Sequence, residues 1–174
     1  MLRLDSDISG TNRIQTIRAA GGNDLAAINR IVESALMTWD LPERVKRLSL
    51  PSYLYHEVDL QHLGIVVAEG NGELTGVAAW EPAEKQDCPA DAQGLLLYGL
   101  YVAPAKKAQG IGRQLLRRAE MAAIDGGFDG VLVKAQADAV GFYEKTGFTE
   151  LPVEDSARNF DKRYWKPVAL PFKS

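Results

Sequence analysis

The chain has 174 residues, of which 46% are hydrophobic and 25% charged, and its formal net charge is −3. This length predicts one domain, and the ordinary share of charged residues excludes an intrinsically disordered protein. The lone cysteine, Cys88, excludes a disulfide scaffold and a metal site built from cysteine pairs, and the mild acidity argues against a nucleic-acid-binding protein.

The beginning of the chain differs from the rest in composition. Residues 1–12 are polar and lack the apolar centre of a signal peptide. No stretch has the roughly 18 apolar residues that a membrane-spanning helix needs. We therefore expect a flexible leader over residues 1–12, a single domain over residues 13–174, no membrane association and a cytoplasmic location.

The first third of the chain predicts a strand followed by helices. Residues Ile14 to Arg18 alternate between apolar and polar, as in a half-buried strand. Asp24 follows a Gly-Gly-Asn break and is placed to cap the next helix, because its carboxylate can accept free amides of a first turn. The helices that we expect are residues 25–36, residues 43–48 between two prolines, and residues 53–62.

Asn71-Gly72 is the strongest hairpin signal, because both positions of such a turn favour positive φ. An almost continuous apolar run begins at Leu95 and indicates a strand buried on both faces, which Pro104 ends. The strands that we expect beside it are residues 64–69, 74–80, 131–133, 148–153 and 164–168.

Two more helices are expected in the second half, and the longer one is amphipathic. Its inward face consists of Ile111, Leu115, Ala119, Ala122 and Ala123. Gly126-Gly127 ends it, and a shorter helix over residues 137–146 follows. This order of elements predicts a mixed α/β sheet of about six to seven strands with hairpin and crossover connections.

A basic, glycine-containing loop leads into the amphipathic helix. Residues 103–118 include five basic residues and no acid, and Gly110 and Gly112 fall at the start of the helix. A helix N-terminus has free amides and a positive dipole end, so it can bind phosphate. The dinucleotide fingerprint G-x-G-x-x-G does not fit, because it needs glycine where Leu115 stands. The loop alone therefore leaves open a phosphate site or a plain turn with a solvated basic face.

Two segments together resemble the GNAT superfamily of N-acetyltransferases. Residues 100–112, with Leu-Tyr-Val-Ala-Pro and then Gln-Gly-Ile-Gly, resemble its acetyl-CoA motif, and residues 139–148 resemble its A-x-x-F-Y-x-x-x-G-F segment. The strong resemblance covers residues 95–148, whereas residues 14–80 agree only in the order of elements. It implies a single-domain sheet flanked by helices and split between its fourth and fifth strands. Lys107 and Gln136 depart from the family pattern, which usually has Gln or Arg and Asn there.

The resemblance implies an enzyme that moves an acetyl group from acetyl-CoA, its co-substrate, to an amine of a small molecule or peptide by direct attack, without a metal. Tyr143 matches the acid that protonates the departing thiolate, and a backbone N–H of Tyr101 or Val102 would polarise the thioester carbonyl. The implied coenzyme-binding residues are Tyr101, Val102, Lys107, Ala108, Gln109, Gly110, Ile111, Gly112, Arg113, Gln136 and Tyr143.

The general base is not evident, because the expected fourth strand contains no acid. Glu81, at the end of the third strand, is our candidate, and a solvated loop position is the competing interpretation. Trp39, Tyr55 and Trp80 are candidates to line the acceptor site or to belong to the core. His56 and His62 are six residues apart and do not share a helical face, which argues against a metal site.

Other functions of the same fold stay open on the sequence. A non-catalytic acyl-CoA-binding sensor or regulatory module is one alternative, and a transferase of a different acyl group is another. Dimers are common in the family, so the resemblance also implies a possible homodimer.

Overall fold

The computed structural model describes residues 15–154 and 162–169 of the protein. Within them the chain forms one seven-stranded sheet in the order β1-β2-β3-β4-β5-β7-β6. The pair β4–β5 is parallel and the other pairs are antiparallel, which confirms the mixed sheet. The strands are β1 Thr16–Ala19, β2 Gly64–Gly70, β3 Glu73–Pro82, β4 Gly94–Val102, β5 Gly130–Lys134, β6 Thr149–Glu150 and β7 Arg163–Pro167.

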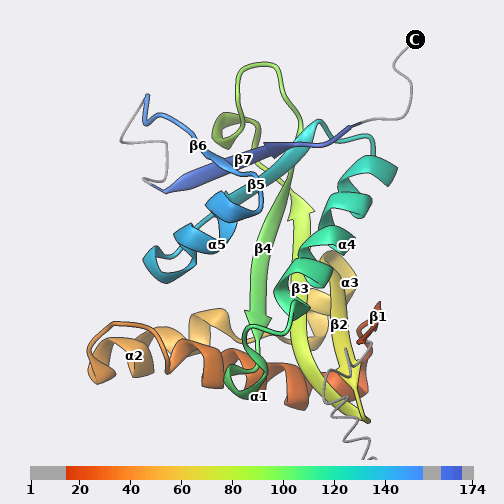
Figure 1. Ribbon diagram of the computed structural model, residues 1–174, viewed down its shortest axis with the longest axis vertical. Helices are drawn as coiled ribbons and strands as arrows, with labels where there is room; N and C mark the ends of the chain where they lie inside the picture. The colour runs from red at the N-terminus through yellow and green to blue at the C-terminus, as the bar shows by residue number, and fades with distance from the viewer. Residues whose placement is uncertain (1–14, 155–161, 170–174) are drawn as a thin grey trace, which may run out of the picture.

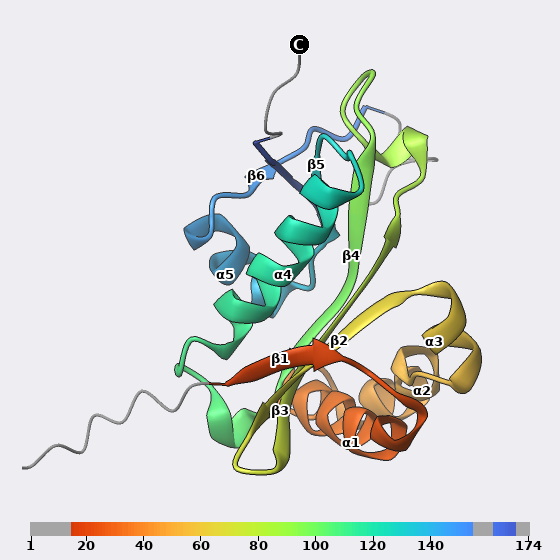
Figure 2. The ribbon, with the colours of Figure 1, turned by 90° about the vertical axis from the view of Figure 1, so that its right-hand side faces the viewer.

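Helices cover both faces of this sheet (Figures 1 and 2). Helices α1, α2 and α3 lie on one face, and α4 and α5 lie on the other. None of the helices in the described part of the chain has the length and apolar character to cross a membrane. The helices are α1 Leu25–Leu36, α2 Glu43–Tyr53, α3 Glu57–His62, α4 Ile111–Asp125 and α5 Val140–Lys145.

The sheet opens between β4 and β5. These strands pair only at Gly94–Gly130, Leu95–Val131 and Leu96–Leu132. Beyond Leu96, β4 continues to Val102 while β5 diverges from it (Figure 1). The expected split between the fourth and fifth strands is therefore confirmed.

A β-bulge interrupts β4 just past the point of divergence. Ala79 of β3 lies opposite Gly99 and Trp80 lies opposite Leu97, so Tyr98 is an extra residue without a counterpart. Before the bulge Leu95 and Leu97 face the α4 side, whereas after it the even-numbered residues from position 100 on face that side. Tyr98 keeps the α1–α3 direction of Leu96, two residues earlier, and the bulge turns Gly99 and Tyr101 to that same side.

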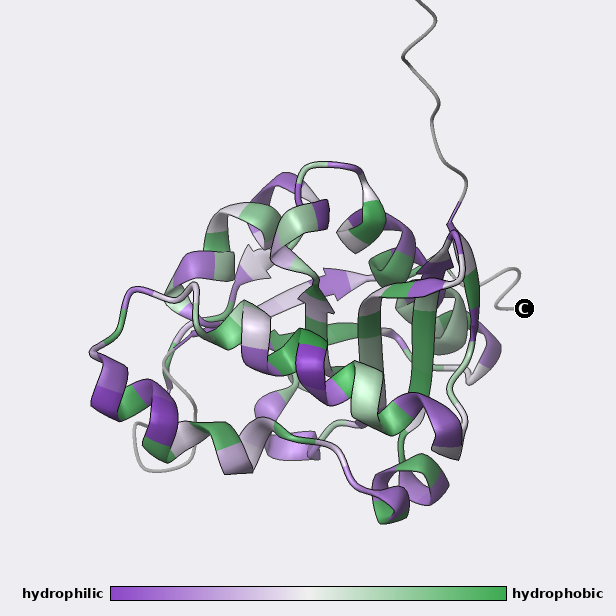
Figure 3. Ribbon diagram, turned by 90° about the horizontal axis from the view of Figure 1, so that it is seen from below, coloured by the Kyte–Doolittle hydropathy of each residue, from purple (hydrophilic) through white to green (hydrophobic). Residues whose placement is uncertain are grey.

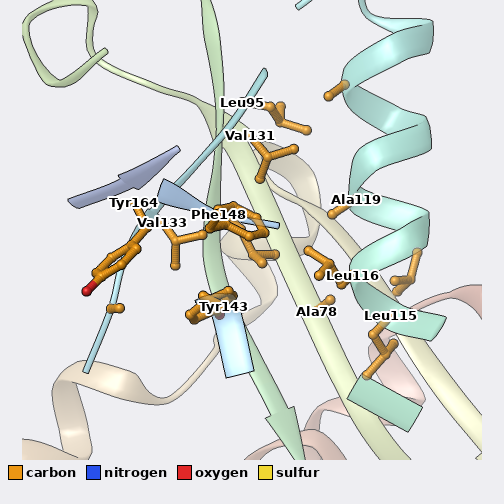
Figure 4. Close-up of a cluster of buried hydrophobic side chains, with 14 of the residues drawn as sticks. Ala78, Leu95, Leu115, Leu116, Ala119, Val131, Val133, Tyr143, Phe148 and Tyr164 are labelled. Carbon is orange, nitrogen blue, oxygen red and sulfur yellow. The ribbon is translucent and has the colours of Figure 1, made fainter. Parts of the chain in front are cut away.

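Separate hydrophobic cores fill the two sides of the sheet. On one side Ile28, Ile31 and Val32 of α1 pack against β2 and β3. Figure 3 shows α1 with hydrophobic and hydrophilic positions alternating along it, as expected for a helix with one buried face. On the other side α4 presents buried positions to the strands (Figure 4); they are Ile111, Leu115, Leu116, Ala119 and Ala123.

Two local predictions at the N-terminal side of the chain are wrong. The carboxylate of Asp24 does not cap α1, because it accepts hydrogen bonds from the Arg18 guanidinium at 2.8 and 2.9 Å and from the Gly21 amide at 2.8 Å. The bonds from Arg18 also hold the pKa of that carboxyl below its usual range. Pro51 does not end the second helix, which runs on to Tyr53. The missing N–H of Pro51 removes one intrahelical hydrogen bond, and only two residues of α2 follow it.

Other boundaries differ from the expectation for identifiable reasons. Helix α3 begins at Glu57 rather than at residue 53, because the Asp59 carboxylate accepts the His56 amide at 2.7 Å and fixes the start. Strand β4 is not buried throughout, since the Tyr98 side chain is half exposed. The penultimate strand is two residues long, and the expected strand residue Ile14 lies outside the described residues.

The α4-side core gives a test of this packing. Leu115 is fully buried against the sheet, so Leu115→Ala should lower the free energy of unfolding by about 3 kcal/mol through lost apolar contacts and a residual cavity. Urea denaturation followed by circular dichroism measures it. Met121→Ala, on the exposed side of the same helix, is the matched control and should stay within about 0.5 kcal/mol of wild type. Equal losses in the two variants would contradict the assigned helix face.

Candidate active site at the split of the sheet

The loop between β4 and α4 ends in a cradle of backbone amides. Gly110, the N-cap residue, has φ 80° and ψ 6°, a left-handed conformation, and Ile111 after it is helical. No side chain caps this terminus, and the amides of Ile111, Gly112 and Arg113 belong to a first turn, where no intrahelical acceptor exists. A left-handed residue followed by a right-handed one makes successive N–H groups converge, which is a geometry that binds anions.

Gly112 lies where three elements meet. A Cβ at this position would lie 3.4 Å from the ring of Phe142 in α5 and 3.8 Å from Val102 in β4. The two segments that carry the resemblance are therefore in contact in the fold. Glycine at 112 leaves only van der Waals space to Phe142, whereas glycine at 110 is favoured by its positive φ.

Basic side chains surround the amide cradle. Lys107, Arg113, Arg117 and Arg118 are exposed, and Lys106 is half-buried. Within residues 15–154 and 162–169, none of them forms an ion pair with a carboxylate, whereas Lys46, Lys134, Lys162 and Lys166 do. Their charge is thus available to an anionic ligand.

The open edge of β4 supplies further backbone donors. The Ala103 amide donates to the Thr75 carbonyl of β3 at 2.8 Å. Successive residues of a strand direct their N–H groups to opposite sides, so the Tyr101 amide also faces β3, and the amides of Leu100 and Val102 face the split. Of the two donors expected from sequence, the geometry thus directs the Val102 amide into the split. The Leu100 amide is a second donor that faces the split, and it could be found only once the register between β3 and β4 was known.

Tyr143 is enclosed beside the split. Its side chain is 5% exposed, and its ring makes edge contacts with Phe142 and Phe148, each with ring centroids 5.2 Å apart (Figure 4). Burial, and secondarily the Tyr101 phenol, raise the pKa of Tyr143 well above that of an ordinary phenol. Its hydroxyl stays protonated at neutral pH and can donate a proton.

Aromatic side chains gather on the opposite side of β4. The rings of Tyr55 and Tyr98 meet edge to face with centroids 6.0 Å apart. A Cβ on Gly99 would overlap the Tyr55 hydroxyl and come within 2.8 Å of the Tyr101 ring, so glycine makes room for both. Sequence reasoning missed Tyr98, because a nearly continuous apolar run does not show which strand residue stays exposed.

A bridge connects this aromatic cluster to the loop after β5. Gln136 Nε2 donates to the Tyr53 hydroxyl at 3.1 Å, and Tyr53 in turn meets Trp39 edge to face at 5.3 Å. The Asp40 amide donates to the Asp138 carboxylate at 3.2 Å in the same region. The helical layer that carries Trp39 thus contacts the coenzyme-side loop across the split.

The remaining candidates fall on different faces. Glu81 is half-buried in β3 opposite Leu96, and its charge contributes to a raised pKa at Tyr98. Trp80 points to the other face, where its ring covers Gly64 and packs with the α4-side core, so the structure does not bring it to the aromatic cluster. Among residues 15–154 and 162–169, no group of three or more His, Cys, Asp or Glu side chains is arranged to hold a metal ion.

Comparison with known families identifies the fold. The family model described as an acetyltransferase (GNAT) domain matches residues 61–150, which include the amide cradle and the segment with Tyr143. The chain belongs to the GNAT family of acetyltransferases. The match leaves out α1 and α2, and with them Trp39, Tyr53 and Tyr55, so the GNAT model covers the amide cradle and Tyr143 and not the aromatic helical layer. No curated protein matches the sequence.

Solved GNAT structures share the fold at low identity. A GNAT-family acetyltransferase from Desulfovibrio desulfuricans is 23% identical, with a TM-score of 0.66 over 90% of this chain and 100% of that one. The PaiA N-acetyltransferase from Thermoplasma acidophilum in complex with coenzyme A is 18% identical (TM-score 0.69, 88% and 99% covered). A GNAT acetyltransferase from Brucella melitensis in complex with acetyl-CoA is 19% identical (TM-score 0.61, 92% of both chains covered).

The buried tyrosines predict an alkaline limit to stability. Burial raises the pKa of Tyr55 and Tyr143 above the value of about 10 expected in the unfolded chain. Their contribution is therefore fully present below pH ~10 and is lost as the pH rises above it, because the unfolded chain ionises first. Each should remove about 1.4 kcal/mol of unfolding free energy per pH unit.

Urea denaturation between pH 8 and 11, with phenolate absorbance as a second readout, tests this limit. Above pH ~10 the unfolding free energy of Tyr55→Phe should decline less steeply with pH than that of wild type, because one of the two buried phenols is missing. A slope unchanged by that substitution would show that the Tyr55 hydroxyl ionises freely in the folded protein.

Proposed function

We propose that the protein transfers an acetyl group from acetyl-CoA directly to an amine of a small molecule or peptide. The observation that carries the proposal is the uncapped amide cradle at Gly110–Arg113, placed at the end of the open edge of β4. The GNAT neighbours crystallised with acetyl-CoA or coenzyme A support it. When bound, acetyl-CoA would supply an activated acyl group and a thiolate leaving group.

The coenzyme would be held mainly by the backbone. The amides of Ile111, Gly112 and Arg113 would bind the pyrophosphate, and the 107–109 loop with its neighbouring basic side chains would add positive charge. The amides of Leu100 and Val102 would donate to the pantetheine and to the thioester carbonyl, because both face the split. Gln136 lies at the other wall of that split.

Two side chains would move protons. Tyr143 would donate its phenolic proton to the departing sulfur, since burial raises its pKa and the hydroxyl therefore carries its proton at neutral pH. Glu81 would accept the proton of the attacking amine, directly or through water, since it is a half-buried acid on the same face as Tyr98. Such a base is needed because an alkylamine with a pKa near 10.4 is almost entirely protonated at pH 7.

The assignment extends to the whole chain. We propose that residues 13–174 act as one domain in the cytoplasm, alone or as a homodimer, with neither nucleic acid nor membrane as a partner. The absence of an acid in β4 keeps a non-catalytic acyl-CoA-binding module as the second candidate, and acceptor-dependent thiol release distinguishes the two.

The amide cradle can be tested with one substitution. Gly112→Asp places a Cβ against Phe142 and a carboxylate beside amides meant for phosphate, so acetyl-CoA affinity should fall by about 100-fold or more. Calorimetric titration measures it. Gly22→Asp is the control, because a Cβ there meets nothing within 4 Å. Wild-type protein that does not bind acetyl-CoA at micromolar concentration would refute the proposal.

Tyr143→Phe tests the acid. The change removes the proton donor and keeps the ring contacts with Phe142 and Phe148, so turnover should fall about 10²-fold while acetyl-CoA affinity stays within about twofold. Steady-state thiol release and calorimetry measure the two quantities. Unchanged turnover would remove Tyr143 from the chemistry.

A further inference from the structure

The aromatic side of the split contains acids without cationic partners. The Asp59 carboxylate of α3 accepts the amide of His56, the residue after Tyr55, and Glu81 of β3 lies opposite Leu96, two residues before Tyr98. Burial, and then the charges of these two acids, raise the pKa of Tyr98. Among the described residues, no lysine or arginine forms an ion pair or hydrogen bond with either acid; the Asp59 carboxylate accepts only the His56 amide. Within residues 15–154 and 162–169, the negative charge of these two acids is therefore not neutralised by an ion pair.

An exposed ring lies beside these acids. The Tyr98 side chain is 49% exposed even though it lies in a central strand, and it is the extra residue of the β4 bulge. One edge of this ring is fixed against Tyr55. A tyrosine face next to a carboxylate is a favourable site for an organic cation, since the ring quadrupole and the negative charge both attract it.

The reacting nitrogen cannot be the cation that occupies this site. A negative, aromatic environment stabilises an ammonium group and raises its pKa, whereas the attacking amine must lose its proton. The two requirements are compatible only if they apply to different nitrogens. The same face also disfavours an acceptor with a carboxylate beside its amine.

We propose that Tyr98, Tyr55 and Asp59 form a subsite for a second cationic group of the acceptor, so that the substrate class is a diamine or polyamine. This inference rests on the proposed acetyl transfer. Tyr98 and Leu100, whose amide faces the split, are two residues apart on β4, so their Cα atoms are at most roughly 7 Å apart. An acceptor with about four methylene groups between its nitrogens spans such a distance, given bonds of ~1.5 Å.

The test compares acceptors that differ in one charge. Wild type should acetylate 1,4-diaminobutane with a kcat/KM about tenfold above that for butylamine, mainly through a lower KM. Tyr98→Leu should bring this ratio below about threefold, whereas Tyr98→Phe, which keeps the ring, should retain it. Asp59→Asn removes the charge but keeps an oxygen for the His56 amide, and should also lower the ratio. Met121→Ala, on the outer side of α4, is the control and should leave the ratio unchanged.

A binding measurement separates this inference from the proposed function. Titration of 1,4-diaminobutane into protein saturated with coenzyme A needs no turnover, and its affinity should fall at least fivefold in Tyr98→Leu. Turnover with equal kcat/KM for the two amines would overturn the inference and leave acetyl transfer standing. Tyr98-dependent diamine binding without thiol release would support the subsite and refute the transferase. Diamine affinity that is the same in wild type and Tyr98→Leu would overturn the subsite.

Discussion

The candidate site depends on backbone hydrogen-bonding groups of β4 that have no partner strand, because β4 and β5 stop pairing after Leu96. Strand amides and carbonyls need hydrogen-bond partners, and an edge inside a sheet normally obtains them from the next strand. Here the Leu100 and Val102 amides face the split instead, next to the uncapped first turn of α4. An elongated ligand with its own amides and phosphates can satisfy both sets of donors.

The two helical layers bring different side chains to this opening. On one side α4 and α5 meet at Gly112 and Phe142 and enclose Tyr143, which makes a dry, anion-binding wall. On the other side α2 and α3 bring aromatic and acidic side chains to the β4 bulge. The family match covers most of the first wall and leaves out α1 and α2 of the second, as expected if coenzyme binding is shared and acceptor binding differs between members.

Sequence was informative where local chemistry determines conformation. Residues 110–112 predicted a helix start, and Gly110 has the positive φ that its residue type permits. The amphipathic helix and the Asn71-Gly72 hairpin were also predictable, whereas the split of the sheet was expected only from the family resemblance. The exposure of Tyr98 and the direction of the Leu100 amide were not, because both depend on a register between β3 and β4 that periodicity cannot reveal. Asp24 does not cap α1, because Arg18, six residues earlier in the chain, forms stronger charge-assisted hydrogen bonds with its carboxylate.

The bulge at Tyr98 reverses the order in which side chains alternate between the two faces along β4. If one residue were deleted there, every side chain from Gly99 to Val102 would exchange faces. The Tyr101 phenol would enter the aliphatic layer under α4, and Leu100 would replace it among the aromatic rings. The strand would then have the same composition apart from one tyrosine, but the side chains on both sides of the opening would be misplaced. A single extra residue therefore decides which side chains of β4 face each side of the sheet.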